Sequence, residues 1–528
     1  MDGGGRQSYV ERYGETITPF RELFSMTVAI SDSVHRRRLF ILSGFAILLL
    51  EIFVLRAPLQ ASLWLDETLS IWVAVGSLAQ VVDRALTYQG QSPLYFMLLH
   101  DFLGLTRNDV MVRVPSILAL IAAGGVFYCI VRRWFPPDVC VLGVALLFSV
   151  DHLLVAGFSV RPYGFALLTS LGATLVLLRI VESQDSFARP LLWAALLVLT
   201  FYFHYLFVGI AVVHLVFLGC RWRMLAPETR RSCVVMAVLG AVAAIPGLEQ
   251  IRSLAGRAPA LSFASAPGLG QLANSIVPLE LALFVGLGLA FARISGPFTL
   301  DRERFEVSWS SLIPFLVWLV GAPLFFFIHA HVTGHSMYVD RWFLWVAPAS
   351  CIAVLSLVAA IDSPRARFVA IAATLGFMIV REAERVWYVE DWRGAAAIVR
   401  ATSPDEPLLF FSGLVELEDP AVTTDPNKYG YLMAPLSTYC VVRSALLLSA
   451  NPRDKDFEAY RARALEPAIA GASSVIFVGL EKMVPRRGGV VSVPDLWEEW
   501  LRERGFTMRE VLHDSAANQV SVRRFRRG

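Results

Sequence analysis

Long apolar runs, separated by short polar segments rich in arginine, occupy most of the chain up to about residue 381. A helix of about 20 apolar residues crosses the hydrocarbon core of a bilayer, so each run is a candidate membrane span. No small-residue cleavage site follows the first run, 39–55, which is interpreted as an uncleaved span. The pattern predicts a polytopic α-helical membrane protein with about eleven spans. The other candidate spans are 114–131, 138–156, 163–178, 190–203, 205–220, 232–248, 272–292, 309–329, 343–361 and 367–380.

The distribution of arginine predicts how the spans are oriented, because cytoplasmic loops are enriched in Lys and Arg. With residues 1–38 in the cytoplasm, the arginine-rich loops alternate as this rule requires, provided that two segments are interpreted as follows. Residues 92–105 do not cross, because they are too few and include charged and polar positions. Residues 191–220 form a hairpin that turns near His204. The first outer loop, 56–112, and the C-terminus then lie outside the cytoplasm.

The region 382–528 mixes charged helical patterns with short apolar strands, which is typical of a small α/β domain. We expect three parts: a cytoplasmic segment (1–38), a membrane domain (39–381) and an extracytoplasmic α/β domain (382–528). In the last part, the predicted helices are DWRGAAAIVRA and PDLWEEWLRERG, and the predicted strands are PLLFFSG, SSVIFVGL and an edge strand, QVSVRRFR.

Composition agrees with the hydropathy pattern and removes several classes of protein. Of 528 residues, 56% are hydrophobic and 17% are charged, against about 25% charged in a soluble domain. The net charge, 47 − 44 = +3, is too small for a nucleic-acid binder. The six cysteines form no CxxC pattern, so neither a disulfide scaffold nor a structural zinc domain is indicated. No lysine precedes Lys428, so arginine is the strong cation of the membrane domain.

Asp66 and Glu67 follow the first span directly. Two carboxylates at the mouth of a membrane helix are costly unless they are solvated or used for chemistry. The alternative is a solvated helix cap, since acidic residues favour a helix N-terminus.

Two arginines mark later outer loops. Arg161 precedes Pro162 where a helix begins, a place suited to gripping a phosphate, although a snorkelling arginine has the same pattern. Arg341 is a second cation at the membrane face. Three histidines in the loop before Arg341 could bind a metal or could simply be solvated. Buried polar residues in the spans could form a proton relay or hydrogen bonds between helices. These are His329, His331 and His335 in the loop, and Glu51, Asp151, His152, His214 and Glu280 in the spans.

Six segments, taken in order, resemble the GT-C glycosyltransferases that use polyprenyl-phosphate sugars, in particular glycosyltransferase family 39, the aminoarabinose-transferase and protein O-mannosyltransferase group. The segments are LWLDE, SPLYFMLLHDFLG with VRVPSILAL, FSVRPYGFALL, LTFYFHYLFVGI, YVDRWFLWVAPA and EDWRGAAAIVR. The resemblance implies a GT-C fold in a bacterial inner membrane. It also implies sugar transfer on the outer face, with inversion, from a lipid-phosphate donor to a lipid, glycan or protein acceptor.

The resemblance also implies the roles of individual residues. Asp66 would be the general base and Glu67 would orient Asp66 or the acceptor. Arg161 and Arg341 would hold the donor phosphate. Further substrate contacts would come from Tyr95, His100, Tyr163, His204 and Tyr338.

The chain departs from the family pattern at two places. Gln91-Ser92-Pro93 stands where relatives carry His-Pro-Pro, and Ser159 stands where they carry an acid, which Asp151 could replace. The second departure does not support a divalent metal, so no metal ligand is assigned and the cofactor stays open. Two other functions remain: a secondary transporter or flippase, and a catalytically altered envelope assembly protein of GT-C fold.

Overall fold

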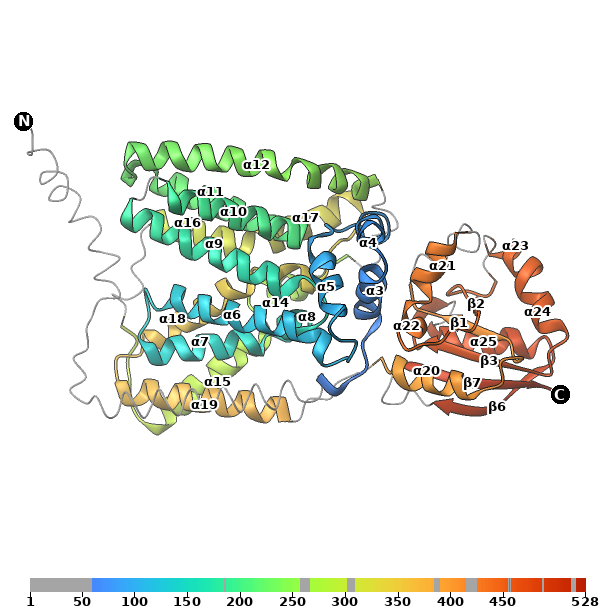
Figure 1. The fold of residues 1–528 in the computed structure, drawn as a ribbon. Coiled ribbons are helices and arrows are strands. Elements are labelled where there is room, and N and C mark those ends of the chain that lie inside the picture. Colours follow the sequence, from blue (N-terminus) through green and yellow to red (C-terminus); the bar gives the residue numbers. More distant parts are fainter. Residues whose placement is uncertain are drawn as a thin grey trace, which may run out of the picture. The chain divides into compact units, whose positions relative to one another are not determined.

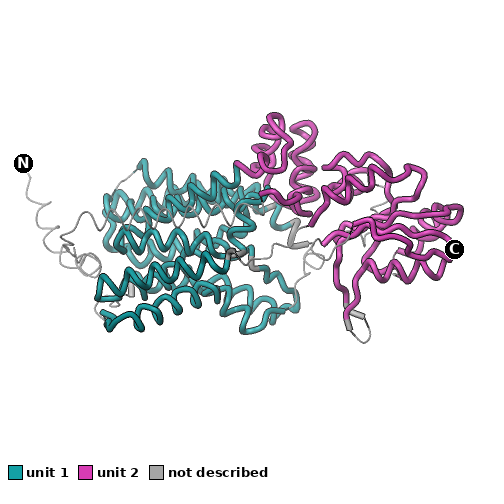
Figure 2. Tube along the Cα trace, turned by 90° about the horizontal axis from the view of Figure 1, so that it is seen from below, with its two compact units in different colours: residues 1–55, 115–385 teal, residues 56–114, 386–528 magenta. Residues whose placement is uncertain are grey.

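The computed structural model describes residues 59–184, 187–256, 266–301, 309–383, 390–414, 425–453, 455, 457–486, 489–513 and 519–528. Figure 1 shows its helices and strands. The chain divides into two compact units, coloured in Figure 2. Unit 1 is Met1–Leu55 with Pro115–Arg385, and unit 2 is Arg56–Val114 with Val386–Gly528.

Unit 1 is helical, and most of its helices run with roughly parallel axes (Figure 1). The predicted spans within the described residues are mostly helical, although 138–156 and 272–292 are each interrupted, and the first span, 39–55, lies outside the described residues. The helices are α6 (Val114–Val131), α7 (Pro137–Ser149), α8 (Asp151–Phe158), α9 (Tyr163–Ser183), α10 (Ala188–Phe203), α11 (Gly209–Arg221), α12 (Pro227–Gly256), α14 (Leu269–Ile276), α15 (Leu279–Ser295), α16 (Trp309–Leu316), α17 (Ala322–Thr333), α18 (Ala347–Ala359) and α19 (Pro364–Ala383).

In the part of the chain that the structure describes, five helices are long and apolar enough to cross a bilayer, or seven if each of two bent pairs is one span. The bent pairs are α7 with α8 and α14 with α15. Helices α10 and α18 are apolar but shorter. The count of eleven crossings therefore stays a prediction, while the helical, membrane-type character of unit 1 is confirmed.

The chain breaks where the hairpin of residues 191–220 is predicted to turn. Helix α10 ends at Phe203, His204 is extended, and a short 3₁₀ turn, η3 (Tyr205–Val208), leads into α11. Residues 191–220 therefore do not form one continuous helix. The stretch predicted not to cross contains α5 (Leu94–Leu103), whose ten residues are too few for a full crossing.

Unit 2 contains a five-stranded sheet in the order β2-β1-β3-β7-β6. Strand β1 is parallel to β2 and β3, whereas β7 is antiparallel to β3 and β6. A separate two-stranded hairpin joins β4 and β5. The strands are β1 (Leu408–Phe411), β2 (Leu446–Leu447), β3 (Ser474–Leu480), β4 (Met483–Arg486), β5 (Gly489–Ser492), β6 (Phe506–His513) and β7 (Val520–Arg527).

The α/β pattern predicted for the C-terminal region is confirmed, with one correction. The segment QVSVRRFR is a strand, β7, but it is not at the edge of the sheet, because β6 pairs with its other side. Strand β6 escapes sequence analysis because most of its residues are exposed, so no alternation of apolar and polar positions marks it.

Helices surround this sheet and complete the unit. Helix α3 carries Leu65 and Leu69 into the same apolar core as Trp392, Phe410 and Trp497. Residues 56–114, expected as a loop of the membrane domain, thus form a compact unit with the C-terminal region. The helices of unit 2 are α3 (Leu65–Ala74), α4 (Leu78–Arg84), α5, α20 (Trp392–Ala401), α21 (Pro426–Leu432), α22 (Ala434–Ser437), α23 (Glu458–Tyr460), α24 (Glu466–Ala470) and α25 (Val493–Arg502), with the short turns η1 (Ala85–Gln89), η2 (Met111–Arg113) and η10 (Arg461–Leu465).

Candidate active site

The predicted acidic pair lies in the first turn of α3. Glu67 is fully buried and Asp66 is half-buried. A carboxylate oxygen of Glu67 accepts the backbone N–H of Trp64 at 3.2 Å, which caps the helix. The helix dipole also favours both negative charges at this end. The interpretation as a helix cap thus describes Glu67, while the neighbouring Asp66 is half-buried, with its Oδ2 atom enclosed.

Arg113 neutralises Glu67. Its Nε and Nη2 donate to the two carboxylate oxygens at 2.8 and 2.5 Å, and both side chains are buried. The same guanidinium donates to the backbone carbonyl oxygens of Ala61 and Ser62 at 3.0 and 3.1 Å. A buried, bidentate pair of this kind holds its geometry firmly. Glu67 is therefore suited to orienting the turn rather than to accepting a proton.

A third carboxyl group, that of Glu390, contacts the same turn of α3. Its Oε2 accepts the backbone N–H of Leu65 at 2.6 Å and the indole N–H of Trp392 at 2.8 Å. The pKa of Glu390 is raised to about 7. Burial is the largest cause, and the negative charges of Asp66 and Glu67 add to it, while the two hydrogen bonds act in the opposite direction and lower the pKa. Three acidic groups from two distant parts of the sequence thus gather around the start of α3.

The segment before α3 is held by a second polar cluster of unit 2. The hydroxyl of Tyr439 donates to Asp109 at 2.8 Å and accepts the backbone N–H of Leu63 at 2.8 Å. Arg393 pairs with Asp109 and donates its backbone N–H to Ser62 Oγ at 3.0 Å. Burial raises the pKa of Tyr439 above its usual range, which keeps this hydroxyl a donor at neutral pH. Residues from the C-terminal region thus hold the chain segment that leads into α3 and Asp66.

The two arginines expected to grip phosphate meet around His204 in unit 1. The positive charges of Arg161 and Arg341 both act on the His204 ring, which is buried. Tyr163 lies beside them, its ring 4.8 Å from that of His204 and 5.9 Å from the Arg161 guanidinium, centre to centre. Helix α8 contacts η7 (Asp340–Phe343), which carries Arg341. The fold therefore gathers cations from two loops that are far apart in the sequence.

Tyr338 lies two residues before η7, the turn that carries Arg341. It is buried, and its ring lies 4.8 Å from that of Phe343. Nδ1 of His204 is buried and makes no hydrogen bond within the described residues. A buried ring nitrogen on which two guanidinium charges act suits a site that receives an oxygen-rich anion.

Tyr95 and His100 lie on α5 in unit 2. Tyr95 is buried against Phe96, with ring centroids 5.6 Å apart. His100 Nδ1 lies 2.9 Å from the backbone oxygen of Ala74, which ties α5 to the end of α3. His100 thus supports α3, and the contact of either residue with substrate stays a prediction.

The second outer loop does not fit a metal ligand at the family's acidic position. The hydroxyl of Ser159 donates to the backbone oxygen of Val155, one turn earlier in α8. Across the described residues, no three His, Cys, Asp or Glu side chains gather in a metal-binding group. His331 Nδ1 instead lies 2.9 Å from the Phe327 carbonyl oxygen of its own helix. The side chain of Asp151 lies outside what the structure describes.

Sequence analysis missed Arg113, Glu390, Asp109 and Tyr439. Arg113 and Glu390 do lie within segments that carry the family resemblance, VRVPSILAL and EDWRGAAAIVR. Nothing in a single sequence indicates which side chains they contact, because those partners are far away along the chain.

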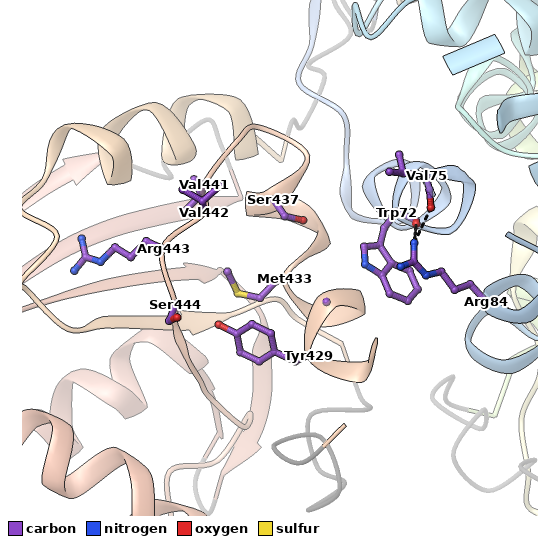
Figure 3. A pocket seen from close by; sticks show the side chains of 11 residues that line it. Trp72, Val75, Arg84, Tyr429, Met433, Ser437, Val441, Val442, Arg443 and Ser444 are labelled. Atoms are coloured by element: carbon purple, nitrogen blue, oxygen red, sulfur yellow. Dashed lines mark hydrogen bonds between the residues drawn. The ribbon is translucent and has the colours of Figure 1, made fainter. Parts of the chain in front are cut away.

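A cavity of about 360 Å³ in unit 2 is separate from these groups (Figure 3). Arg84 lies against it, with its guanidinium 4.3 Å from the centre of the Trp72 ring and hydrogen bonds to the backbone oxygens of Trp72 and Val75. None of the predicted catalytic or substrate residues lines this cavity. Its lining is Trp72, Val75, Arg84, Tyr429, Gly430, Met433, Ser437, Val441, Val442, Arg443 and Ser444.

Comparison with known proteins adds little to this picture. No family model matches the chain, and no curated protein matches it. Among solved structures, the apo form of ArnT from Cupriavidus metallidurans is similar, with a TM-score of 0.45 and 12% identity, over 99% of this chain and 98% of that one. A likeness at this level assigns neither a shared activity nor shared residues.

Proposed function

We propose that this chain is a membrane glycosyltransferase that moves a sugar from a polyprenyl-phosphate donor to an envelope acceptor. The observation that carries the proposal is the gathering of Arg161 and Arg341 around His204. The six sequence segments that resemble glycosyltransferase family 39 support it, as do the apolar helices of unit 1. We propose that the transfer takes place at the outer face of a bacterial inner membrane, where the donor and the surrounding lipids are the partners.

The arginines bind the leaving group. The phosphate of the donor departs with the electron pair of the bond to the sugar C1 carbon, so its negative charge grows in the transition state. Guanidinium groups that donate paired hydrogen bonds stabilise such charge. In this proposal His204 and Tyr338 contact the same phosphate group, and the Tyr163 ring packs against the ring of His204.

Asp66 removes the proton from the acceptor. As the acceptor hydroxyl oxygen attacks C1 and forms the new bond, its proton moves to the Asp66 carboxylate, and the bond from C1 to the phosphate oxygen breaks on the opposite face. This single displacement inverts the anomeric centre. Glu67, held by Arg113, keeps the turn that presents Asp66 in place. No step uses a metal.

The test is Asp66→Asn in proteoliposomes supplied with a polyprenyl-phosphate sugar and an envelope extract as acceptor. General-base catalysis contributes roughly 10²–10⁴-fold in rate, so we expect a loss of that size. Asp101→Asn is the matched control, since Asp101 is exposed on α5. Transfer by Asp66→Asn at the wild-type rate would remove Asp66 as the base, and no transfer by the wild-type chain would remove the proposal.

A flippase or secondary transporter is the second candidate, and the bent pairs α7–α8 and α14–α15 favour it. Transporters place broken helices at the substrate site. The same proteoliposomes distinguish the two functions. A transporter moves labelled donor across the bilayer with the bond to the sugar intact, whereas a transferase releases polyprenyl phosphate.

A further inference from the structure

Glu390 is the contact through which the C-terminal region reaches the turn that carries Asp66. Leu65 is the first residue of α3, so its backbone N–H is one of the helix-end donors that the helix itself leaves unsatisfied. Glu390 supplies the acceptor for this N–H, and the Trp392 indole fixes the same carboxylate oxygen. The Trp392 ring is itself fully buried in the core of unit 2. The restraint on α3 is thus anchored in packed structure.

The charges around Glu390 come from three directions. Asp66 and Glu67 approach from α3, and Glu67 is neutralised by Arg113 of η2. On the α20 side, Asp391 accepts the Gly394 N–H and lies 3.3 Å from His513, while Arg393 is paired with Asp109. Among the described residues, no basic side chain forms an ion pair with Glu390. Its carboxyl group therefore meets buried surroundings and acidic neighbours.

We propose that Glu390 is a positioning residue for Asp66, which fixes the first turn of α3 and so the direction in which the Asp66 carboxylate points. The part that concerns Asp66 rests on the proposed function, whereas the restraint on α3 does not. Glu390 performs this role as the neutral acid. Its Oε2 accepts both N–H groups and its proton resides on Oε1, so no second negative charge faces Asp66.

The restraint weakens when Glu390 ionises. Its pKa of about 7 is raised above the ordinary value, 4.5, chiefly by burial. An ionised carboxylate in the same place is desolvated and repelled by Asp66. We therefore expect the first turn of α3 to be held most firmly below pH 4.5, to loosen as the pH rises from 4.5 to 7, and to change no further above pH 7.

Hydrogen exchange of the full-length protein in nanodiscs tests the proposal, followed for the peptide that covers residues 63–70 between pH 5.5 and 8.5. Values are corrected for the intrinsic rise of exchange with pH. Glu390→Ala should raise exchange about tenfold at pH 6, since it removes an acceptor from a buried N–H. Glu390→Gln keeps an acceptor oxygen, so it should protect the turn as the wild type does at low pH and abolish the loosening as the pH rises to 7. Glu510→Gln, on exposed β6, is the matched control.

Two exchange results would overturn the proposal: equal exchange of wild type and Glu390→Ala, or the same pH dependence in wild type and Glu390→Gln. Transfer from a polyprenyl-phosphate sugar separates the remaining outcomes. If the wild type transfers and Glu390→Ala shows the same rate and pH profile, the positioning role is wrong. If the exchange pattern holds but the wild type transfers nothing, the proposed function fails and the restraint on α3 stands.

Discussion

Arg113 holds Glu67 in a buried, bidentate ion pair, with hydrogen bonds of 2.8 and 2.5 Å. The two residues are 46 positions apart, and the pair joins the turn that precedes α6 to the first turn of α3. It therefore ties together two segments of unit 2 that are distant in the sequence.

Arg113→Ala should destabilise the protein strongly. Removing one partner of a buried ion pair leaves the other charge buried and uncompensated, which costs roughly 3–5 kcal/mol. Arg113→Lys keeps the charge but not the bidentate geometry, so its stability should lie between that of the wild type and that of Arg113→Ala. Thermal unfolding in detergent measures the effect. Arg502→Ala is the control, since Arg502 pairs with Glu498 on the exposed side of α25 and such pairs contribute at most about 1 kcal/mol. Equal shifts for Arg113→Ala and Arg502→Ala would contradict the prediction.

Arg161→Ala and Arg341→Ala should each weaken binding of polyprenyl phosphate. Hydrogen bonds to charged groups contribute roughly 1.5–3 kcal/mol, which corresponds to about a 10- to 100-fold rise in Kd. Lysine at either position should restore part of the affinity. Binding is measured with labelled lipid in nanodiscs, and Arg293→Ala, an exposed position on α15, is the control. An unchanged Kd in both variants would place the phosphate grip elsewhere.

Glu390 should make stability depend on pH. Its pKa is raised from 4.5 to about 7 on folding, so the unfolded chain loses its proton at lower pH than the folded chain does. Stability contributed by this group is complete below pH 4.5, falls as the pH rises and is lost by the time the pH passes 7. The unfolding midpoint of the wild type, relative to Glu390→Gln, should thus decrease between pH 4.5 and 7. A constant difference across this range would show that Glu390 is ionised throughout.

Tyr439→Phe should loosen the segment that precedes α3. The variant loses the hydroxyl that accepts the Leu63 N–H and donates to Asp109. A buried donor without a partner costs about 1–3 kcal/mol. The change is measured as faster hydrogen exchange at residues 60–64, with β3 as the internal reference. Unaltered exchange at these residues would mean that the hydroxyl contributes nothing to their order.

Alkaline phosphatase fused at residue 80, and in a second chain at the C-terminus, should be active. Both positions are expected outside the cytoplasm from the arginine pattern, and the enzyme folds to its active form only there. A fusion in the loop around Arg223 should be inactive. Activity at Arg223 together with inactivity at residue 80 would reverse the predicted orientation.

The sequence predicted most of the architecture because hydrophobic burial acts locally. The apolar runs became helices, and the strands of the C-terminal region with apolar patterns were found at their places. Strand β6 was missed because it is exposed and paired on one side only, so its sequence carries no burial pattern. The turn near His204 was predicted, whereas the break between α14 and α15, inside the predicted span 272–292, was not.

The candidate site was predictable only where a residue type signals its chemistry. Asp66 and Glu67 were found because two carboxylates beside an apolar run are unusual. The neutralisation of Glu67 depends on Arg113, and nothing near Glu67 in the sequence indicates this pairing. The contact of Glu390 with Leu65 joins residues 325 positions apart, and no local pattern specifies such a pairing.

The joining of residues 56–114 with residues 386–528 in one unit sets the order in which the protein can mature. At a synthesis rate of about 5–20 residues per second, the N-terminal piece waits on the order of tens of seconds for the C-terminal piece. During that time Leu65 and Leu69 lack the core that buries them, and the Leu65 amide lacks its acceptor. A ribosome that stops after α19 would leave a chain that lacks these contacts, so the acidic turn is ordered only once residues 386–528 have been made.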